Sequence, residues 1–343
     1  MRAVWPAPSP DELLSSYLVR SASLRGLSAQ SFVSLICPHI PVWNRDIDAN
    51  PHELLLLQLA RAMDCGLEAV KEMTLVDWIV PVVRVAPSGV RRWVNAIGVY
   101  HRSRIRHGLC YCPVCLDQSR HFDKHWRMSF WTVCPEHSLL LLDACPHCDA
   151  PVVPHRQKLD ICRCDQCHQL LTDRPSRPAV PTAAQAVLAA AMRFPSLTHY
   201  RPCSPATGQE YSLGMHLLLS AFLDARIRSW GVAGRLRDRI ELRRVHQRHQ
   251  DLQLLDEIVS RWPYSMLSLA QRHHLTQRSF RQSCPGWLAQ AASQLPPGRV
   301  NGVGFPSLSR LRQASCAQLA RTPGWRTMRA QILLDIAGKQ DGY

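Results

Sequence analysis

Four short pairs of potential metal ligands constrain the fold of this chain more than any other feature of its sequence. Each pair encloses two residues, and the pairs read CPVC at 112–115, CPEH at 134–137, CPHC at 145–148 and CDQC at 164–167. Eighteen residues separate the first pair from the second, and fifteen separate the third pair from the fourth. This spacing is typical of structural zinc sites, in which a tight turn presents two ligands to the same ion. The sequence therefore predicts a tandem zinc module near the centre of the chain.

The predicted ligands fall into two sets of four when the pairs are taken in sequence order. The first set is Cys112, Cys115, Cys134 and His137, and the second set is Cys145, Cys148, Cys164 and Cys167. A catalytic zinc keeps an open position beside three protein ligands, so four ligands at each site favour two closed, structural Zn²⁺ ions per chain. Two questions stay open at this point. The first is which thiols bind the ions, because Cys162 could replace Cys164 as a ligand and Cys110 is a spare thiol beside the first pair. The second is the pairing, because a cross-braced arrangement would join 112–115 to 145–148 instead.

The composition favours metal binding over disulfides and indicates a nucleic acid or nucleoprotein as partner. The N-terminal stretch MRAVWPAPSPDELL contains no apolar signal core. No run reaches the roughly 18 apolar residues of a membrane helix. We therefore expect a cytoplasmic protein without membrane contact, in a reducing compartment where paired cysteines bind metal. The net charge is +15, and only four of the 41 Lys and Arg residues are lysine. Guanidinium groups suit phosphates and base edges.

The spacing of apolar residues predicts a mainly α-helical fold. Ser9, Pro10 and Glu12 form a capping signal for a first helix. Its apolar face would be Leu13, Leu14, Tyr17, Leu18 and Ala22. Ser28 opens a second helix, and Asn50 is expected to cap a third.

The third and fourth helices, expected at 54–63 and 67–73, have the spacing of a helix-turn-helix. Ala60 is small where two helices approach, Val70 would fill the core, and Asp64 stands where glycine is commoner. A plain helical hairpin explains the pattern equally well. The second helix of the pair carries two Glu and one Lys, a poor surface for phosphates, so we expect it to contact protein.

Three domains are predicted along the chain. Residues 1–105 form an N-terminal helical domain with a helix-turn-helix, 106–175 the tandem zinc module, and 176–343 a C-terminal helical region. The proline-rich stretch TDRPSRPAVPT at 172–182 marks a linker. Further helices are expected at 183–194, 215–230 and 318–336. A second helix-turn-helix spacing involves Ala270, Leu275, Phe280 and Thr276, which would cap its second helix.

Arginines beside aromatic residues are the candidate nucleic-acid contacts. Within 76–109, Trp93 and Tyr100 lie among five of them, Arg91, Arg92, Arg102, Arg104 and Arg106. From the C-terminal helix pair, Arg278 and Arg281 would project. Cations interleaved with rings suit a nucleic-acid backbone. The other interpretation of 76–109 is a charged connector that leads into the zinc module. The basic stretch 231–251 is likewise either a solvated helix face or a phosphate-facing surface.

The cysteine-rich stretch resembles the TniQ/TnsD family of transposon target-selection proteins. The residues that carry the resemblance are CPVCL at 112–116, HWR at 125–127, CPEH at 134–137, LL at 140–141 and CPHC at 145–148. The opening PSPDELLSSYLVR at 8–20 is similar to the start of that family. Trp262-Pro263 falls where members of that family have a similar Trp-Pro dipeptide, before the last helical part. The resemblance spans roughly residues 6 to 290, with its specific motifs in the first 170.

The resemblance implies a non-catalytic adaptor with a helix-turn-helix near its N-terminus and a tandem zinc region. Such proteins mark the insertion site and recruit an AAA+ transposition ATPase. Some bind an attachment site on DNA directly through a longer C-terminal region. Others dock on an RNA-guided CRISPR Cascade complex, often as a homodimer. At 343 residues this chain is shorter than the direct DNA binders usually are, which favours docking on another targeting complex or use in a mercury-resistance-type transposon.

Two other classes of function compete with the adaptor. A zinc-containing, sequence-specific DNA-binding regulator would use the net charge and the region around Arg278 and Arg281. A nuclease of the HNH type would use His121, Asp123 and His125 beside the knuckles. The sequence around these three residues contains no further acidic cluster, which such a nuclease would need to bind its metal. No GxxxxGK[ST] motif is present, so we expect no nucleotide hydrolysis.

Overall fold

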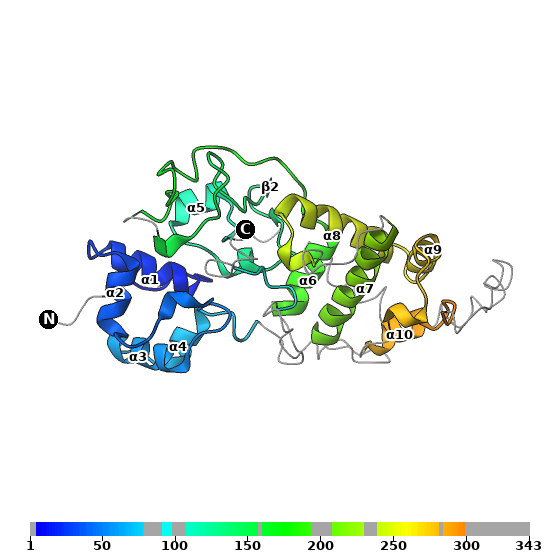
Figure 1. Cartoon of the computed structure of the whole chain (residues 1–343), viewed down its shortest axis with the longest axis horizontal. Coiled ribbons are helices and arrows are strands. Elements are labelled where there is room, and N and C mark those ends of the chain that lie inside the picture. Colours follow the sequence, from blue (N-terminus) through cyan, green and yellow to red (C-terminus); the bar gives the residue numbers. More distant parts are fainter. Residues whose placement is uncertain are drawn as a thin grey trace, which may run out of the picture. The chain divides into compact units, whose positions relative to one another are not determined.

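The computed structural model describes residues 5–78, 91–97, 108–156, 160–193, 208–229, 239–280 and 284–298. These residues form ten α-helices, short 3₁₀ turns and one two-stranded hairpin (Figure 1). The predicted mainly α-helical class is therefore confirmed. The chain divides into two compact units, the first of Met1–Pro181 with Arg244–His246, the second of Thr182–Arg243 with Gln247–Tyr343. The division into three domains stays a prediction.

Four helices lie together at the N-terminal end of the first unit (Figure 1). They are α1 (Leu14–Ser23), α2 (Ala29–Ile36), α3 (Glu53–Met63) and α4 (Leu67–Glu72), with the 3₁₀ turn η1 (Val42–Asn44) between α2 and α3. Helix α2 begins where predicted, because the Ser28 hydroxyl accepts a hydrogen bond from the Ser31 amide at 3.0 Å. Helix α3 is capped by His52 at 3.2 Å and not by Asn50, whose side chain accepts from Arg91.

Helix α1 begins later than its sequence signal predicts. Asp11 has a left-handed backbone with φ 56°, and the residue before the helix, Leu13, makes no side-chain cap. Half of the expected capping box is present, since the Glu12 carboxylate accepts from the Ser9 amide at 3.0 Å. The same carboxylate is buried and pairs with Arg20 at 2.6 Å. Glu12 therefore fixes the turn before the helix.

Helices α3 and α4 form the helical pair that the sequence predicts. Asp64 ends α3 with φ 54°, a left-handed backbone that Asp adopts more readily than most side chains. Ala60 and Val70 are both buried, as expected for residues where two helices pack. The two helices and their turn are confirmed, and their identity as a DNA-binding motif stays a prediction.

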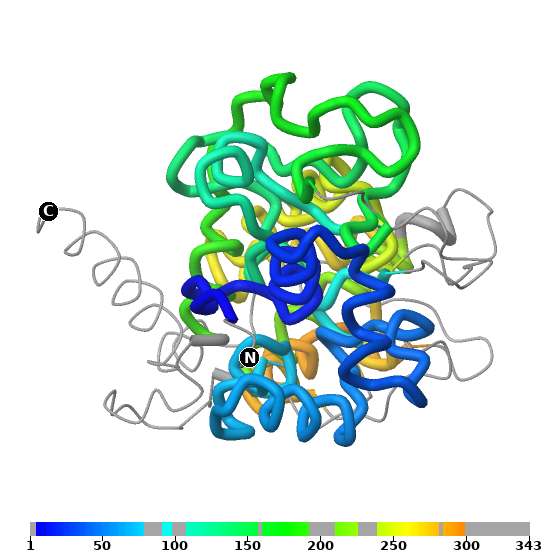
Figure 2. Tube along the Cα trace, turned by 90° about the vertical axis from the view of Figure 1, so that its left-hand side faces the viewer, coloured from blue at the N-terminus to red at the C-terminus, as the bar shows by residue number. Residues whose placement is uncertain are grey.

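The cysteine-rich stretch has little regular structure. It contains α5 (Pro113–Ser119), η2 (Lys124–Arg127), β1 (Val133–Cys134), β2 (Leu139–Leu140) and η3 (Pro154–Arg156). Strands β1 and β2 are antiparallel, with Val133 opposite Leu140 and Cys134 opposite Leu139. In Figure 2 the green trace that follows β2 runs first as a series of loops. Such a stretch depends on side-chain anchors, because it has almost no backbone ladder of its own.

Backbone hydrogen bonds join the segment before α1 to the loop after α5. The Leu13 amide donates to the Phe122 carbonyl at 2.9 Å, and the Lys124 amide donates to the Asp11 carbonyl at 2.8 Å. The Ser16 hydroxyl accepts from the Phe122 amide at 2.9 Å, across 106 positions of sequence. The N-terminal motif and the cysteine-rich stretch are therefore parts of the same folded body.

A buried arginine joins three further segments of this unit. Arg127 is 1% exposed, and its guanidinium pairs with Asp46 at 2.5 Å and with Asp48 at 3.1 Å. Asp48 also accepts hydrogen bonds from the amide and the hydroxyl of Ser15, each at 2.8 Å. Burial raises the pKa of Asp48 to about 6, against the attraction of Arg127, which lowers it. Arg127 thus compensates two carboxylates that folding removes from water.

The second unit is built from helices. They are α6 (Ala183–Arg193), α7 (Gly208–Ser229), α9 (Tyr264–Arg272), α10 (Gly286–Ala292) and, from Gln247 on, α8 (Val245–Val259), with the 3₁₀ turns η5 (Ile240–Leu242) and η6 (Gln277–Phe280). The amides of Ala183 and Ala184 at the start of α6 donate to Asp256 at 2.9 and 2.6 Å. Gly214 lies against Trp287, whose ring would be 2.1 Å from an added Cβ.

The helix expected after Thr276 is a 3₁₀ turn over the described residues of η6. The Gln277 amide donates to the Pro296 carbonyl, and its side chain donates to the carbonyls of Ser293 and Leu295, so contacts distant in sequence hold this turn. The helices expected at 183–194 and 215–230 are confirmed as α6 and α7. The pair expected at 318–336 lies outside the described residues. Within the described ranges, no helix combines the length and apolar character of a membrane span.

Replacing Arg127 with Met should destabilise the first unit strongly. The change leaves Asp46 and Asp48 without their cation, and removing one partner from a buried ion pair costs about 3–5 kcal/mol. Arg163→Met, at an arginine whose side chain is 49% exposed, is the control and should cost less than about 0.5 kcal/mol. Thermal unfolding at pH 7 measures both. Adding Asp46→Asn and Asp48→Asn to Arg127→Met should recover part of the loss, and equal stability of the two single variants would contradict the role of Arg127.

Candidate metal centres

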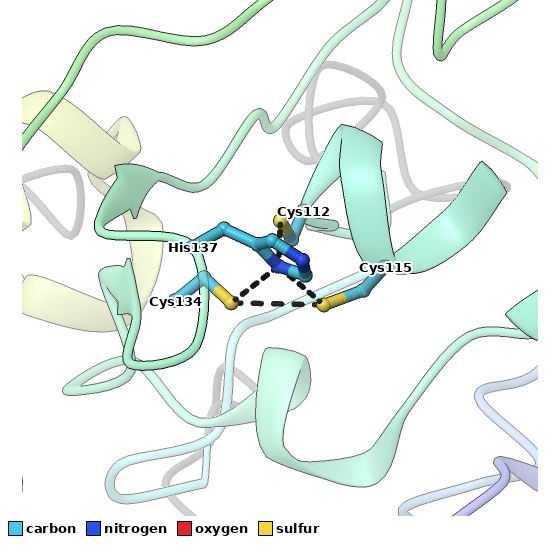
Figure 3. A group of neighbouring side chains, drawn as sticks. All are labelled: Cys112, Cys115, Cys134 and His137. Atoms are coloured by element: carbon cyan, nitrogen blue, oxygen red, sulfur yellow. Dashed lines mark hydrogen bonds between the residues drawn. The ribbon is translucent and has the colours of Figure 1, made fainter. Parts of the chain in front are cut away.

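The first candidate centre combines a helix start with a tight hairpin. Cys112 precedes the first residue of α5, and Cys115 lies in its first turn, where Pro113 fits the opening position. Cys134 ends strand β1, and His137 lies in the turn that leads to β2. Figure 3 shows the three sulfur atoms and the imidazole pointing toward one another. The two halves of the site therefore come from separate local structures, each of which presents two ligands.

The distances in this cluster fit a tetrahedral zinc site. Nδ1 of His137 lies 3.2, 3.5 and 3.7 Å from the sulfur atoms of Cys115, Cys134 and Cys112, and the Cys115 and Cys134 sulfurs are 3.6 Å apart. Zn–S bonds of about 2.3 Å and Zn–N bonds of about 2.0 Å place neighbouring ligand atoms about 3.5–3.8 Å apart. The four ligand atoms lie within 4.8 Å of one another. The donor set and its spacing are thus compatible with zinc.

The second candidate centre is built from two similar turns. Its ligand atoms also lie within 4.8 Å of one another, and they belong to Cys145, Cys148, Cys164 and Cys167. The sulfurs of Cys145 and Cys167 are 3.6 Å apart, and those of Cys148 and Cys164 are 3.7 Å apart. Cys148 is exposed, whereas the first cluster has no exposed member. This set of four sulfurs is likewise compatible with zinc.

The same backbone turn recurs at three of the four ligand pairs. In each, the amide four residues after the first cysteine donates back to that cysteine's carbonyl, at Ser138, Asp149 and His168. Each of these three residues has a left-handed backbone, with φ of 50°, 56° and 60°. The turn aims both ligands of a pair to one side. The pairs meet in tandem order, 112–115 with 134–137 and 145–148 with 164–167, and not cross-braced.

Two spare cysteines lie outside both clusters. The Cys162 sulfur points to the Leu116 carbonyl at 3.6 Å, and the Cys110 sulfur accepts from the Asn95 amide group at 3.7 Å. Both are buried. Burial raises the pKa of Cys162 to about 11, which keeps its thiol protonated. The structure thus brings Cys164, and not Cys162, into the second cluster.

The thiols within the first cluster share protons. Hydrogen bonds from the Cys115 and Cys134 thiols lower the pKa of Cys112 to about 3, and the same sharing raises the pKa of Cys115. A group of thiols in which one member ionises readily is a good starting point for a cation, because thiolates are the metal-binding form. Four ligands at each centre leave no open position for substrate, so the arrangement suits a structural ion.

Side chains connect the two clusters within the first unit. Arg120, at the end of α5, pairs with Asp160 at 2.8 Å, and Thr172 donates to Asp117 at 3.0 Å. The hydroxyl of Tyr111, which precedes Cys112, is 3.3 Å from the carbonyl oxygens of Ala144 and Leu171. The clusters are therefore neighbours in a single framework.

The residues considered for nuclease chemistry have structural contacts. Asp123 accepts from the amide of His125 at 2.6 Å and pairs with its ring at 2.7 Å, which caps the turn η2. The His125 ring packs between Trp78 and Trp131, at centroid distances of 4.8 and 4.6 Å. The ring nitrogen Nδ1 of His121 lies 3.1 Å from the Ser119 carbonyl. These contacts account for the three residues as parts of the fold.

The candidate nucleic-acid residues are only partly described. Arg102, Arg104, Arg106, Arg281 and Tyr100 lie outside the described residues. Arg91 donates to Asn50 at 3.2 Å, and Arg92 is half-buried beside it. Trp93 is 1% exposed and packs on Phe130, so its ring cannot stack on a base. Arg278 is exposed on η6 in the second unit. The expected interleaving of cations with accessible rings is therefore wrong at Trp93.

Two sets of charged residues have partners that the sequence does not predict. One is the buried group of Arg127, Asp46 and Asp48; the HWR motif at 125–127 was a signal for it, but nothing local pointed to its partners. The other is Arg244, which pairs with Asp143 at 3.2 Å and with Asp149 at 2.7 Å. Arg244 lies in the stretch interpreted as a solvated or phosphate-facing run of charge. Its neighbour Arg243 pairs with Asp251 at 3.0 Å.

Comparison with known proteins gives one family match. Residues 3–141 match the family model described as TniQ, which takes in helices α1–α4, the first cluster and the hairpin of β1 and β2. The second cluster follows the matched stretch. No curated protein matches the chain. The resemblance seen in the sequence motifs is confirmed by this match over residues 3–141.

Proposed function

We propose that this chain is a non-catalytic transposition adaptor that marks a target site and recruits an AAA+ transposition ATPase. The TniQ match over residues 3–141 carries the proposal, because it associates the chain with transposition. The adaptor docks on a targeting complex, such as an RNA-guided Cascade complex, or on DNA. The closed four-ligand clusters support a binding role, since they provide scaffolding and no open coordination position.

In this proposal each cluster holds one structural Zn²⁺ ion. Cys112, Cys115, Cys134 and His137 bind the first ion, and Cys145, Cys148, Cys164 and Cys167 bind the second. The donor set of seven thiols and one imidazole is the set that zinc prefers. Because β1 and β2 contain two residues each and the rest is mostly loop, the ions would supply much of the folding energy of this stretch.

The outer face of α4 suits a protein partner better than DNA. Glu68 and Glu72 are exposed on this helix, and Glu53 and Asp77 are exposed near it. The only lysine of the helix, Lys71, pairs with Glu68 at 2.7 Å. Carboxylates repel phosphates, whereas they attract basic side chains on a protein surface. We therefore assign the α3–α4 pair to docking on a protein component of the transposition machinery.

A DNA-binding regulator is the second candidate, and the net charge of +15 favours it. Such a charge attracts nucleic acid without specifying a sequence. The two candidates differ in what the isolated protein can do. A regulator alone holds a specific duplex with a steep dependence on salt, whereas an adaptor needs its protein partners.

The metal assignment predicts different metal contents for two neighbouring cysteine variants. Cys164→Ser should lose one of two zinc ions per chain, because it removes a ligand from the second cluster. Cys162→Ala should keep both ions, since its sulfur faces the Leu116 carbonyl. Elemental analysis of the purified proteins measures the difference. Loss of zinc from Cys162→Ala alone would reverse the assignment, and less than one ion per wild-type chain would contradict metal binding altogether.

The adaptor function predicts capture of an AAA+ ATPase. The tagged chain should retain an AAA+ transposition ATPase in a pull-down with nucleotide present. In a gel-shift assay without partners, it should bind random and genomic duplexes equally, with affinity falling steeply between 50 and 200 mM salt, taken as roughly the range over which phosphate contacts weaken. Tight sequence-specific binding by the isolated chain, together with failure to capture the ATPase, would favour the regulator.

Reversing the charge of α4 should weaken docking on the protein partner. The variant Glu68→Lys with Glu72→Lys should reduce capture about tenfold, because it places cations where carboxylates faced a basic surface. Gln30→Lys with Ser34→Lys adds two lysines to exposed positions of α2 and is the control, which should keep normal capture. Both variants should retain their zinc. Equal capture by the two variants would remove α4 from the interface.

A further inference from the structure

One arginine of the first unit spans the turn that contains Cys145 and Cys148. Nη1 of Arg244 lies 3.2 Å from Asp143, and Nη2 lies 2.7 Å from Asp149. Asp143 precedes Cys145 by two residues, and Asp149 directly follows Cys148. The amide of Val245, the first residue of α8, also donates to Asp143 at 2.8 Å. The two carboxylates therefore hold the start of α8 from both sides of the ligand pair.

The position of Asp143 is set by the framework around the clusters. The neighbouring Leu142 exchanges backbone hydrogen bonds with Tyr111, at 2.9 and 2.8 Å, and the carbonyl of Ala144 is 3.3 Å from the Tyr111 hydroxyl. Tyr111 itself directly precedes the ligand Cys112. A carboxylate at the first residue of a helix accepts an amide that has no partner within the helix. Asp143 therefore acts as the cap of α8, although it lies 102 positions earlier in sequence.

The position of Asp149 depends more directly on the second cluster. Its backbone is left-handed, with φ 56°, and its amide closes the turn by donating to the Cys145 carbonyl at 3.0 Å. The Cys145 amide donates to the Ala150 carbonyl at 2.8 Å. This turn is short, and its two sulfurs converge on those of Cys164 and Cys167. An ion that binds all four sulfurs would hold the turn in the shape that Arg244 recognises.

Residues 243 and 244 are held in different ways. Arg243 pairs with Asp251, and both belong to the second unit. Arg244, Val245 and His246 belong to the first unit, and α8 then continues in the second. The chain thus passes between units on both sides of these three residues. Within the first unit, Arg244 and the Val245 amide contact the cysteine-rich stretch at Asp143 and Asp149.

We propose that metal in the second cluster governs this attachment, so that Arg244 and the start of α8 are held only while Cys145, Cys148, Cys164 and Cys167 bind an ion. Loss of the ion lets the 145–148 turn open, which separates Asp149 from Asp143. Arg244 then loses its two-sided pairing, and the Val245 amide loses its ordered acceptor. The Asp143 contact is the stronger one, because the Asp149 side chain is 76% exposed and its pairing is screened by solvent. The inference rests on the metal binding proposed above.

Hydrogen exchange of the full-length chain tests this attachment. Exchange of the amides at 245–248 is compared between the wild type, Cys148→Ser and Cys148→His, with the zinc content measured on the same samples. Cys148→Ser should lose one ion and exchange these amides about tenfold faster. Cys148→His should regain the ion and the slow exchange, because three thiolates and one imidazole also form a structural zinc site. The amides of Leu218 and Phe222, buried on α7, report whether the second unit stays folded.

A variant that keeps the metal but lacks the Asp143 carboxylate distinguishes the effect of the Val245 hydrogen bond from the effect of the ion. Asp143→Ala should retain two ions and still exchange the amides at 245–248 about tenfold faster, because it removes the acceptor of the Val245 amide, which holds the first turn of α8. The proposal is overturned if Cys148→Ser loses its ion while the exchange at 245–248 stays within twofold of the wild type. It is also overturned if Cys148→His regains the ion without slowing the exchange. A wild-type chain with no metal would defeat the metal assignment itself, while Asp143→Ala would still report on the cap.

Discussion

The buried guanidinium of Arg127 is the interaction on which the first unit depends. It compensates Asp46 and Asp48, and Asp48 in turn holds both the amide and the hydroxyl of Ser15 at the start of α1. A buried charge that loses its partner is far more costly than an exposed one. The loop before α3, helix α1 and the turn η2 can therefore reach their places only together. This coupling explains why the N-terminal motif and the cysteine-rich stretch form one unit.

Features of the sequence that act over a few residues predicted the structure well. A ligand pair with two intervening residues needs only one turn, so the eight metal-site residues converge as their spacing indicates. Ser28 caps α2 because its partner, Ser31, is three positions away. The start of α1 was misplaced for the opposite reason. Glu12 pairs with Arg20, while Asp11 and Leu13 hydrogen-bond to a loop more than 100 positions away, and nothing local reveals those partners.

Burial decided the points that residue type left open. Cys162 and Cys164 have the same thiol, but Cys162 faces a carbonyl in the core and Cys164 faces three other sulfurs. Trp93 looked like a platform for a base, yet its ring fills the core against Phe130. In the basic stretch that leads into α8, Arg243 and Arg244 pair with carboxylates. Sequence gives the chemistry of each side chain, whereas tertiary packing decides whether that chemistry faces solvent.

Charge acts in two ways in this molecule, through the net charge of the whole chain and through the local charge of one helix. A net charge of +15 draws nucleic acid toward the chain, but at physiological salt a charge acts over only about 8 Å, so contact specificity depends on the local surface. On α4 that surface is acidic, with Glu68 and Glu72 exposed. In the function proposed above, a chain that is basic overall and acidic on one helix pair would remain near nucleic acid while that helix pair binds a basic protein. Both Cys/His clusters follow α4 in the sequence, and four ligands at each suit a structural ion that would hold the framework of the first unit.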